Sequence, residues 1–135
     1  MSSKTHIDIL VIGSGPGGYA AAFRAADLGK KVIIIDKDPT LGGVCLNRGC
    51  IPSKTLLHIA KVLEETESLK KMGVSFAKPQ IDIDSVRDWK NKIINQLSGG
   101  IAQMAKARKV ETIEGVATFI SDKEIQVESK SGKEN

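Results

Sequence analysis

The feature that most constrains the fold of this chain is the glycine-rich segment Gly13–Gly18, which lies between an apolar run and an alanine-rich stretch. The run at residues 7–12 is rich in β-branched side chains and stops at the first glycine, as a buried parallel strand does. Pro16 suits the first turn of a helix, and Gly29 suits its C-terminal end. We therefore predict a strand at 7–12 and a helix over 16–28.

The glycines of this segment match a dinucleotide-binding fingerprint. Gly13 permits the tight turn after the strand, Gly15 lets the backbone approach a pyrophosphate, and Gly18 allows close contact between helix and strand. A second apolar run at residues 31–36 completes a strand, helix, strand unit, which predicts a right-handed parallel crossover. Asp36, at the end of that run, is placed to accept hydrogen bonds from the hydroxyls of an adenosine ribose.

Two long helices are predicted in the middle of the chain. The first ends at Gly73 and carries apolar residues at helical spacing: Leu56, Leu57, Ile59, Ala60 and Leu63. The second begins with Asp82 or Asp84 as its N-cap and carries the stripe Val86, Trp89, Ile93, Leu97, Ile101 and Met104. Because glycine weakens a helix, we expect close packing or a bend at Gly99 and Gly100.

The C-terminal part of the chain changes to short alternating runs, which predict strands at 110–113, 116–120 and 125–127. A hairpin turn is expected at 121–123 and a further turn at 129–133, with no strand after it. From this unfinished pattern we expect the chain to be a fragment. The fold class that these elements indicate is α/β, a partial Rossmann-like domain with a parallel sheet, two long helices and a C-terminal β-meander.

Composition excludes several classes of function. The net charge of +4 comes from basic and acidic residues that are mixed along the chain, and aromatic residues make up 4% of it, so nucleic acid is not an expected partner. No apolar run has the length of a membrane span, and no signal peptide is evident, so we expect a cytoplasmic protein without membrane contact.

The chain has two cysteines, Cys45 and Cys50, with four residues between them. We expect no metal site, because His6 and His58 are not at zinc-finger spacing from them. In a reducing compartment a redox role is favoured over a structural one. Pro52 indicates that a helix begins near Cys50, so residues 45–49 would loop back for a bond to form. The helix N-terminus and Lys54 would then favour a thiolate at Cys50.

The segment 43–54, with sequence GVCLNRGCIPSK, closely resembles the active-site segment of the FAD-dependent pyridine nucleotide-disulfide reductases. The resemblance extends from Ile7 to the end of the chain and is greatest to the branch that oxidises dihydrolipoamide. The glutathione and mercuric reductases share the cysteine spacing and are the alternative within the family. A small non-catalytic nucleotide-binding redox module is the alternative of another class.

The resemblance implies that FAD occupies the glycine fingerprint. Asp36 would bind its adenosine ribose with Lys37 beside it, although the family usually has Glu at the position of Asp36. Lys54 would approach the flavin ring. The pyrophosphate and ribityl part would lie along Gly42, Gly43, Val44 and Cys45, and the adenine end would meet the backbone of Gly115 and Ala117.

The same resemblance implies a direction of electron flow. Cys50 would face the flavin and Cys45 would exchange with a dithiol substrate, so that dihydrolipoamide is oxidised and NAD⁺ is the final acceptor. The partners would be the dihydrolipoyl groups of 2-oxo acid dehydrogenase complexes or the glycine cleavage system, and the full enzyme would be a homodimer. Residues 1–135 would form a truncated N-terminal FAD-binding domain without the NAD-binding and interface domains, and we expect this chain to be inactive alone.

Overall fold

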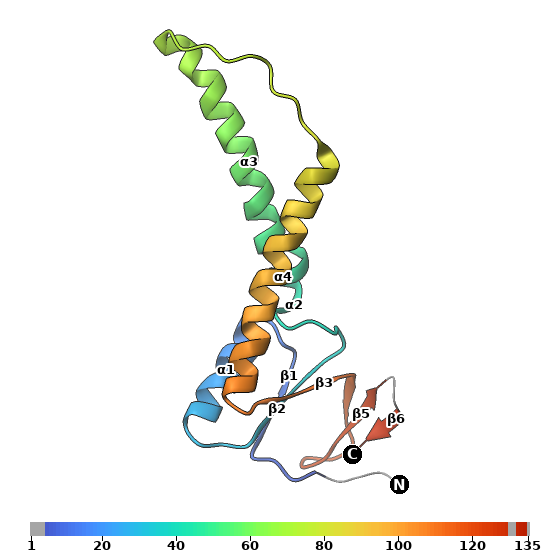
Figure 1. The fold of residues 1–135 in the computed structure, drawn as a ribbon. Helices are drawn as coiled ribbons and strands as arrows, with labels where there is room; N and C mark the ends of the chain where they lie inside the picture. The colour runs from blue at the N-terminus through green and yellow to red at the C-terminus, as the bar shows by residue number, and fades with distance from the viewer. Residues whose placement is uncertain (1–4, 130–131, 135) are drawn as a thin grey trace.

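A computed structural model describes residues 5–129 and 132–134 of the chain. Its centre is a parallel sheet of three strands, in the order β1 (Ile9–Ile12), β2 (Val32–Asp36) and β3 (Glu111–Glu114) (Figure 1). The helix α1 (Pro16–Asp27) connects β1 to β2. The predicted strand, helix, strand unit is thereby confirmed, and Gly29 follows the helix with a positive φ of 81°.

The two faces of β2 are buried in different clusters. Val32 and Ile34 pack on one side with α1 and with the C-terminal half of α4 (Ile83–Ala107). Ile33 and Ile35 point to the other side, where Val127 covers them. A parallel strand that is covered on both faces needs apolar side chains at successive positions. This explains why the sequence of β2 is a continuous apolar run up to Asp36.

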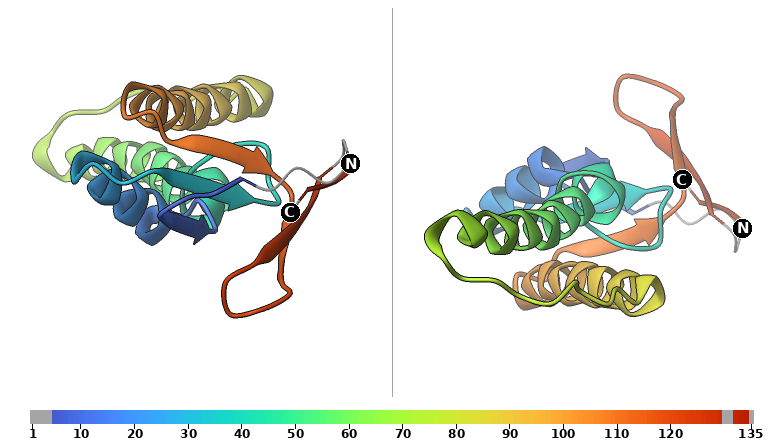
Figure 2. Two further views of the ribbon diagram at one scale, coloured as in Figure 1. Left: turned by 90° about the horizontal axis from the view of Figure 1, so that it is seen from below. Right: turned by 90° about the horizontal axis from the view of Figure 1, so that it is seen from above.

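The C-terminal strands β4 (Val116–Phe119), β5 (Ile125–Ser129) and β6 (Gly132–Glu134) form a separate antiparallel sheet. Both views in Figure 2 show the β4–β5 hairpin extending away from α4. The expected meander is present, with two corrections. The run at 110–113 contributes to the parallel sheet through β3. The strand β6 begins within the turn expected at 129–133, so the expectation of no further strand was wrong. Residues 130–131 of that turn lie outside the described residues.

The helices α3 (Cys50–Ser68) and α4 stand side by side and extend away from the sheet (Figure 1). A short 3₁₀ helix, η1 (Leu69–Met72), ends at Gly73, as predicted. The carboxylate of Asp82 accepts hydrogen bonds from the amides of Asp84 and Ser85, so Asp82 is the N-cap of α4. None of the helices within the described ranges combines the length and apolar character that crossing a bilayer requires.

The predicted apolar stripes of these helices are only partly correct. Of the stripe on α4 only Ile101 is buried, and the other buried residues of this helix are Ser98 and Ala105. The reason is that α4 meets the core with its C-terminal half alone, while its N-terminal half extends beyond the sheet. A Cβ added at Gly99 or Gly100 would meet no atom within 4 Å, so the close packing expected there is absent, and α4 continues through both residues.

Candidate functional site

The glycine loop forms a tight turn from β1 into α1. Gly13 has a φ of 95°, a conformation that favours glycine, and a Cβ at Gly18 would collide with the carbonyl oxygen of Gly13. Gly15 is the N-cap of α1, and a Cβ there would meet nothing within 4 Å. The loop is thus open in the direction of a Gly15 Cβ and tightly packed in the direction of a Gly18 Cβ.

The N-terminus of α1 has the properties of an anion site. The first turn of a helix leaves amide N–H groups without intrahelical acceptors and carries the positive end of the helix dipole. Among the described residues, no side chain caps this end of α1, and its first turn holds no acidic residue. These amides can therefore bind phosphate oxygens, so the donor set fits the pyrophosphate of a dinucleotide.

Asp36 lies where the glycine loop, the loop after β2 and the end of β3 meet. Its Oδ2 accepts hydrogen bonds from the amide and the hydroxyl of Ser14, each over 2.6 Å. Its Oδ1 accepts one from the amide of Asp38 over 2.9 Å. The carbonyl oxygen of Asp36 accepts a fourth, from the amide of Gly115 over 2.8 Å. Lys37, the next residue, is exposed.

These contacts hold the pKa of Asp36 below its ordinary value of 3.8. Partial burial acts in the opposite direction, because removal from water disfavours the charged carboxylate. The hydrogen bonds from the amide of Asp38 and from both donors of Ser14 outweigh that effect, and the nearby charge of Lys37 adds to them. Asp36 is therefore ionised at neutral pH and available as a hydrogen-bond acceptor.

The loop after β2 leads directly onto the glycine loop. The amide of Gly42 donates to the carbonyl oxygen of Ser14 over 2.9 Å, and Gly42 has a φ of 112°. A Cβ on Gly43, whose φ is 61°, would lie 2.7 Å from the Cα of Gly15. The helix α2 (Gly43–Arg48) therefore begins in close contact with the glycine loop, and Val44 in its first turn is 63% exposed.

Cys45 and Cys50 form a disulfide with their Cα atoms 4.8 Å apart. Cys45 lies in α2 and Cys50 is the first residue of α3, so the bond spans the break between two helices at Gly49. The expectation that residues 45–49 form a loop was wrong, because residues 45–48 are helical. The expectation that a helix begins near Cys50 is confirmed. Cys45 is half-buried and Cys50 is exposed.

Two polar side chains of α2, Asn47 and Arg48, hold this helix in place. No sequence pattern had indicated a structural role for them. The Asn47 amide nitrogen lies 3.0 Å from the carbonyl oxygen of Gly43, 3.4 Å from that of Leu41 and 3.5 Å from that of Thr40. The guanidinium of Arg48 forms an ion pair with the carboxylate of Asp38. Since the loop from Asp38 to Leu41 precedes α2, these contacts fasten the disulfide-bearing helix to the chain that follows β2.

The remaining predicted residues occupy different surroundings. A Cβ at Gly115 would lie 2.7 Å from Val127 Cγ1 and 3.0 Å from a backbone oxygen of β5, so only glycine fits there. Ala117 packs against the cluster of Ile33, Ile35 and Val127. Lys54 and His58 are exposed on α3. The structure thus brings together the glycine fingerprint, Asp36, Gly42, Gly43 and Gly115. Ala117, in β4, lies instead against the face of the parallel sheet that carries Ile33 and Ile35.

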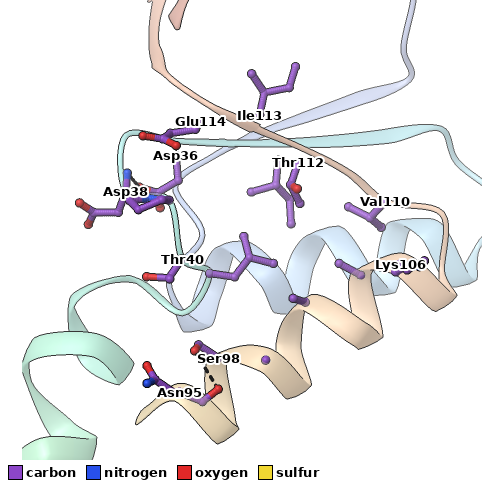
Figure 3. A pocket seen from close by; sticks show the side chains of 16 residues that line it. Asp36, Asp38, Thr40, Asn95, Ser98, Lys106, Val110, Thr112, Ile113 and Glu114 are labelled. Atoms are coloured by element: carbon purple, nitrogen blue, oxygen red, sulfur yellow. Dashed lines mark hydrogen bonds between the residues drawn. The ribbon is translucent and has the colours of Figure 1, made fainter. Parts of the chain in front are cut away.

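A cavity of about 660 Å³ lies beside Asp36, between the loop after β2, the strand β3 and the helix α4 (Figure 3). Asp36, Asp38 and Glu114 line one end, and Asn95 and Ser98 of α4 line the opposite wall. The sequence did not indicate a role for α4 in this cavity. Within the described residues, no group of three or more His, Cys, Asp or Glu side chains is placed to hold a metal ion.

Comparison with known proteins extends these observations. A sequence model of the family described as pyridine nucleotide-disulphide oxidoreductase matches residues 7–134. Proteins named dihydrolipoyl dehydrogenase are similar along almost the whole chain: that of Vibrio cholerae is 53% identical over 98% of this chain, and that of Haemophilus influenzae is 49% identical over 98%. That of Bacillus subtilis is 45% identical over 89%. The chain spans 28%, 28% and 25% of these relatives' own lengths.

Proposed function

Because this chain belongs to the pyridine nucleotide-disulphide oxidoreductase family, we propose that it is the FAD- and disulfide-bearing part of a dihydrolipoyl dehydrogenase. The observation that carries the proposal is the placement of α2, which bears Cys45 of the disulfide and begins in contact with Gly15. The cysteine pair thereby adjoins the loop that we propose to bind the dinucleotide. The named relatives favour dihydrolipoamide over the glutathione and mercuric alternatives.

The chain offers a set of groups that fits the adenosine diphosphate half of FAD. The amides at the N-terminus of α1 would hold the pyrophosphate, and Asp36 would accept a hydrogen bond from the ribose. Gly42 and Gly43 bring the backbone of α2 alongside the glycine loop. The backbone of Gly115 would meet the adenine end. When bound, FAD would supply a two-electron acceptor that collects electrons from the reduced cysteines and passes a hydride to NAD⁺.

The cysteines themselves carry out thiol–disulfide exchange. A thiolate of the dihydrolipoyl group attacks Sγ of Cys45, the bond to Cys50 breaks, and Cys50 leaves as a thiolate. The second substrate thiol, on losing its proton to solvent, attacks the substrate sulfur of the mixed disulfide and releases Cys45 as a thiolate. The substrate is thus oxidised to its cyclic disulfide, and the two cysteines receive its two electrons. The position of Cys50 at the start of α3 favours its departure as thiolate.

The rest of the proposed activity belongs to the whole protein, because the chain spans only 28% of the first relatives' length. We propose that the whole protein uses NAD⁺ as acceptor, acts as a homodimer in the cytoplasm, and serves 2-oxo acid dehydrogenase complexes or the glycine cleavage system. The 135-residue chain alone is expected to produce no NADH from dihydrolipoamide, and steady-state NADH production by it would contradict that expectation.

The exchange step is tested by incubating the oxidised chain with dihydrolipoamide or with reduced glutathione at equal thiol concentration. We expect dihydrolipoamide to reduce the disulfide faster, and both cysteine thiols should appear when the unreacted substrate is removed. A Cys45→Ser variant should form no lipoamide. If glutathione reduced the disulfide and dihydrolipoamide did not, the result would favour the substrate of another reductase of the family.

A further inference from the structure

Ser14 lies between Gly13 and Gly15 of the glycine loop and is not one of the fingerprint glycines. It is fully buried, with 0% of its surface exposed. Its hydroxyl and its amide both donate to Oδ2 of Asp36 over 2.6 Å, and its carbonyl oxygen accepts from the amide of Gly42 over 2.9 Å. Ser14 therefore links the glycine loop to β2 through its side chain and to the start of α2 through its backbone.

We propose that Ser14 is a positioning residue for the nucleotide site, and that its hydroxyl fixes the carboxylate of Asp36 in the orientation that accepts a ribose hydroxyl. A carboxylate oxygen offers two acceptor positions. Both positions on Oδ2 are used by Ser14, and one on Oδ1 is used by Asp38. Within the described residues, one position on Oδ1 remains for a single hydroxyl of the ribose.

The Ser14 hydroxyl determines which oxygen of Asp36 is left for a ligand. An aspartate carboxylate stands close to its own backbone, so the orientation of its two oxygens depends on the donors around it. Without the Ser14 hydroxyl, Oδ2 keeps only the backbone amide of Ser14, and its vacant acceptor position would compete with Oδ1 for the ribose. The hydroxyl thus selects the oxygen that faces the ligand.

The side-chain contact can be removed without disturbing the backbone. Ser14→Ala deletes the hydroxyl and keeps the amide bond to Asp36 and the bond from Gly42. A matched control exists on α4, where the hydroxyl of Ser85 donates to the carboxylate of Asp82 over 2.7 Å, far from the glycine loop in the sequence. Ser85→Ala removes the same kind of contact at an exposed site.

Two measurements test the proposal. The first is a carbon NMR titration of the Asp36 side chain, which needs no cofactor: Ser14→Ala should raise the pKa of Asp36, whereas Ser85→Ala should leave it unchanged. The second is FAD affinity from quenching of flavin fluorescence, in which Ser14→Ala should weaken binding by about threefold to tenfold, as expected for the loss of one ordinary hydrogen bond. Ser85→Ala should bind FAD like the unmodified chain.

A double-mutant cycle separates positioning from a general loss of structure. If Ser14 acts through Asp36, Ser14→Ala should weaken FAD binding no further in an Asp36→Asn background. Equal weakening in both backgrounds, or an unchanged pKa of Asp36 in Ser14→Ala, would overturn the proposal. Because Asp36 anchors FAD only under the function proposed above, failure of the unmodified chain to bind FAD would count against that function, while the titration would still decide whether Ser14 controls Asp36.

Discussion

The amide of Gly42 donates a hydrogen bond to the carbonyl oxygen of Ser14 over 2.9 Å, and this bond joins two segments that are both predicted to bind a dinucleotide. Directly after it, the chain turns into α2, which carries Cys45. The disulfide is therefore positioned from the glycine loop through a single short stretch of backbone. Changes at that junction should affect cofactor binding and disulfide chemistry together.

Gly43→Ala is expected to disrupt this junction. The new Cβ would lie 2.7 Å from the Cα of Gly15, and the φ of 61° is unfavourable for alanine. We expect the free energy of unfolding in urea to fall by about 1–3 kcal/mol, a range typical of backbone strain, and FAD binding to weaken. Gly99→Ala is the control, since its Cβ meets open space in a helix interior, and it should raise stability by up to about 1 kcal/mol. Similar losses in both variants would contradict this assignment.

Loss of the disulfide should have a modest effect on stability. The bond between Cys45 and Cys50 closes a very short loop, so the chain-entropy model assigns it only about 2 kcal/mol. Denaturant titrations of the oxidised and reduced chain should therefore differ by roughly that amount, with the helical circular dichroism retained. Unfolding of the chain on reduction would show that the disulfide is a structural requirement.

The first half of the fold could be predicted because its signals are local. The strand at residues 9–12, the helix after Pro16 and the turn at Gly29 follow from apolar runs and from the preferences of proline and glycine. The site of Asp36 at the end of β2 follows from the same pattern. Membership of β3 in the parallel sheet depends on pairing with a strand more than seventy residues away, and no local pattern encodes it.

The helix α2 could not be predicted for a related reason. It has six residues, and a helix this short is not stable by propensity alone. Its geometry depends on the amide of Asn47, which reaches carbonyl oxygens outside the helix, and on the disulfide to Cys50. The partly buried bond between Ser14 and Asp36 also joins residues 22 apart in sequence, so no local pattern predicts it.

Stability should depend on the ionisation of Asp36 at acid pH. Its pKa is lower in the folded chain than the ordinary value of 3.8, so its contribution is complete above that value and is lost as the pH falls through the folded pKa. The difference in the free energy of unfolding between the unmodified chain and Asp36→Asn should be largest near neutral pH and shrink below about pH 4. A difference that is constant from neutral pH to pH 3 would contradict the lowered pKa.

Asn47→Asp should loosen the disulfide-bearing helix. The substitution replaces the donor amide with a carboxylate that faces the carbonyl oxygens of Gly43, Leu41 and Thr40. We expect a loss of about 1–3 kcal/mol in stability and faster reduction of the disulfide by dithiothreitol. Asn91→Asp, at an exposed position of α4, is the matched control and should change neither property. Equal reduction rates in the two variants would show that Asn47 does not position α2.

The proposed transfer of electrons between disulfide and flavin is measured by counting the electrons that the chain takes up with FAD bound. In an anaerobic titration with dithionite, the chain saturated with FAD should accept about four electrons per bound flavin, two for the flavin and two for the disulfide. The double variant Cys45→Ser with Cys50→Ser should bind FAD and accept about two. Uptake of only two electrons by the oxidised unmodified chain, or failure to bind FAD at saturating concentration, would contradict the proposal that disulfide and flavin form one redox site.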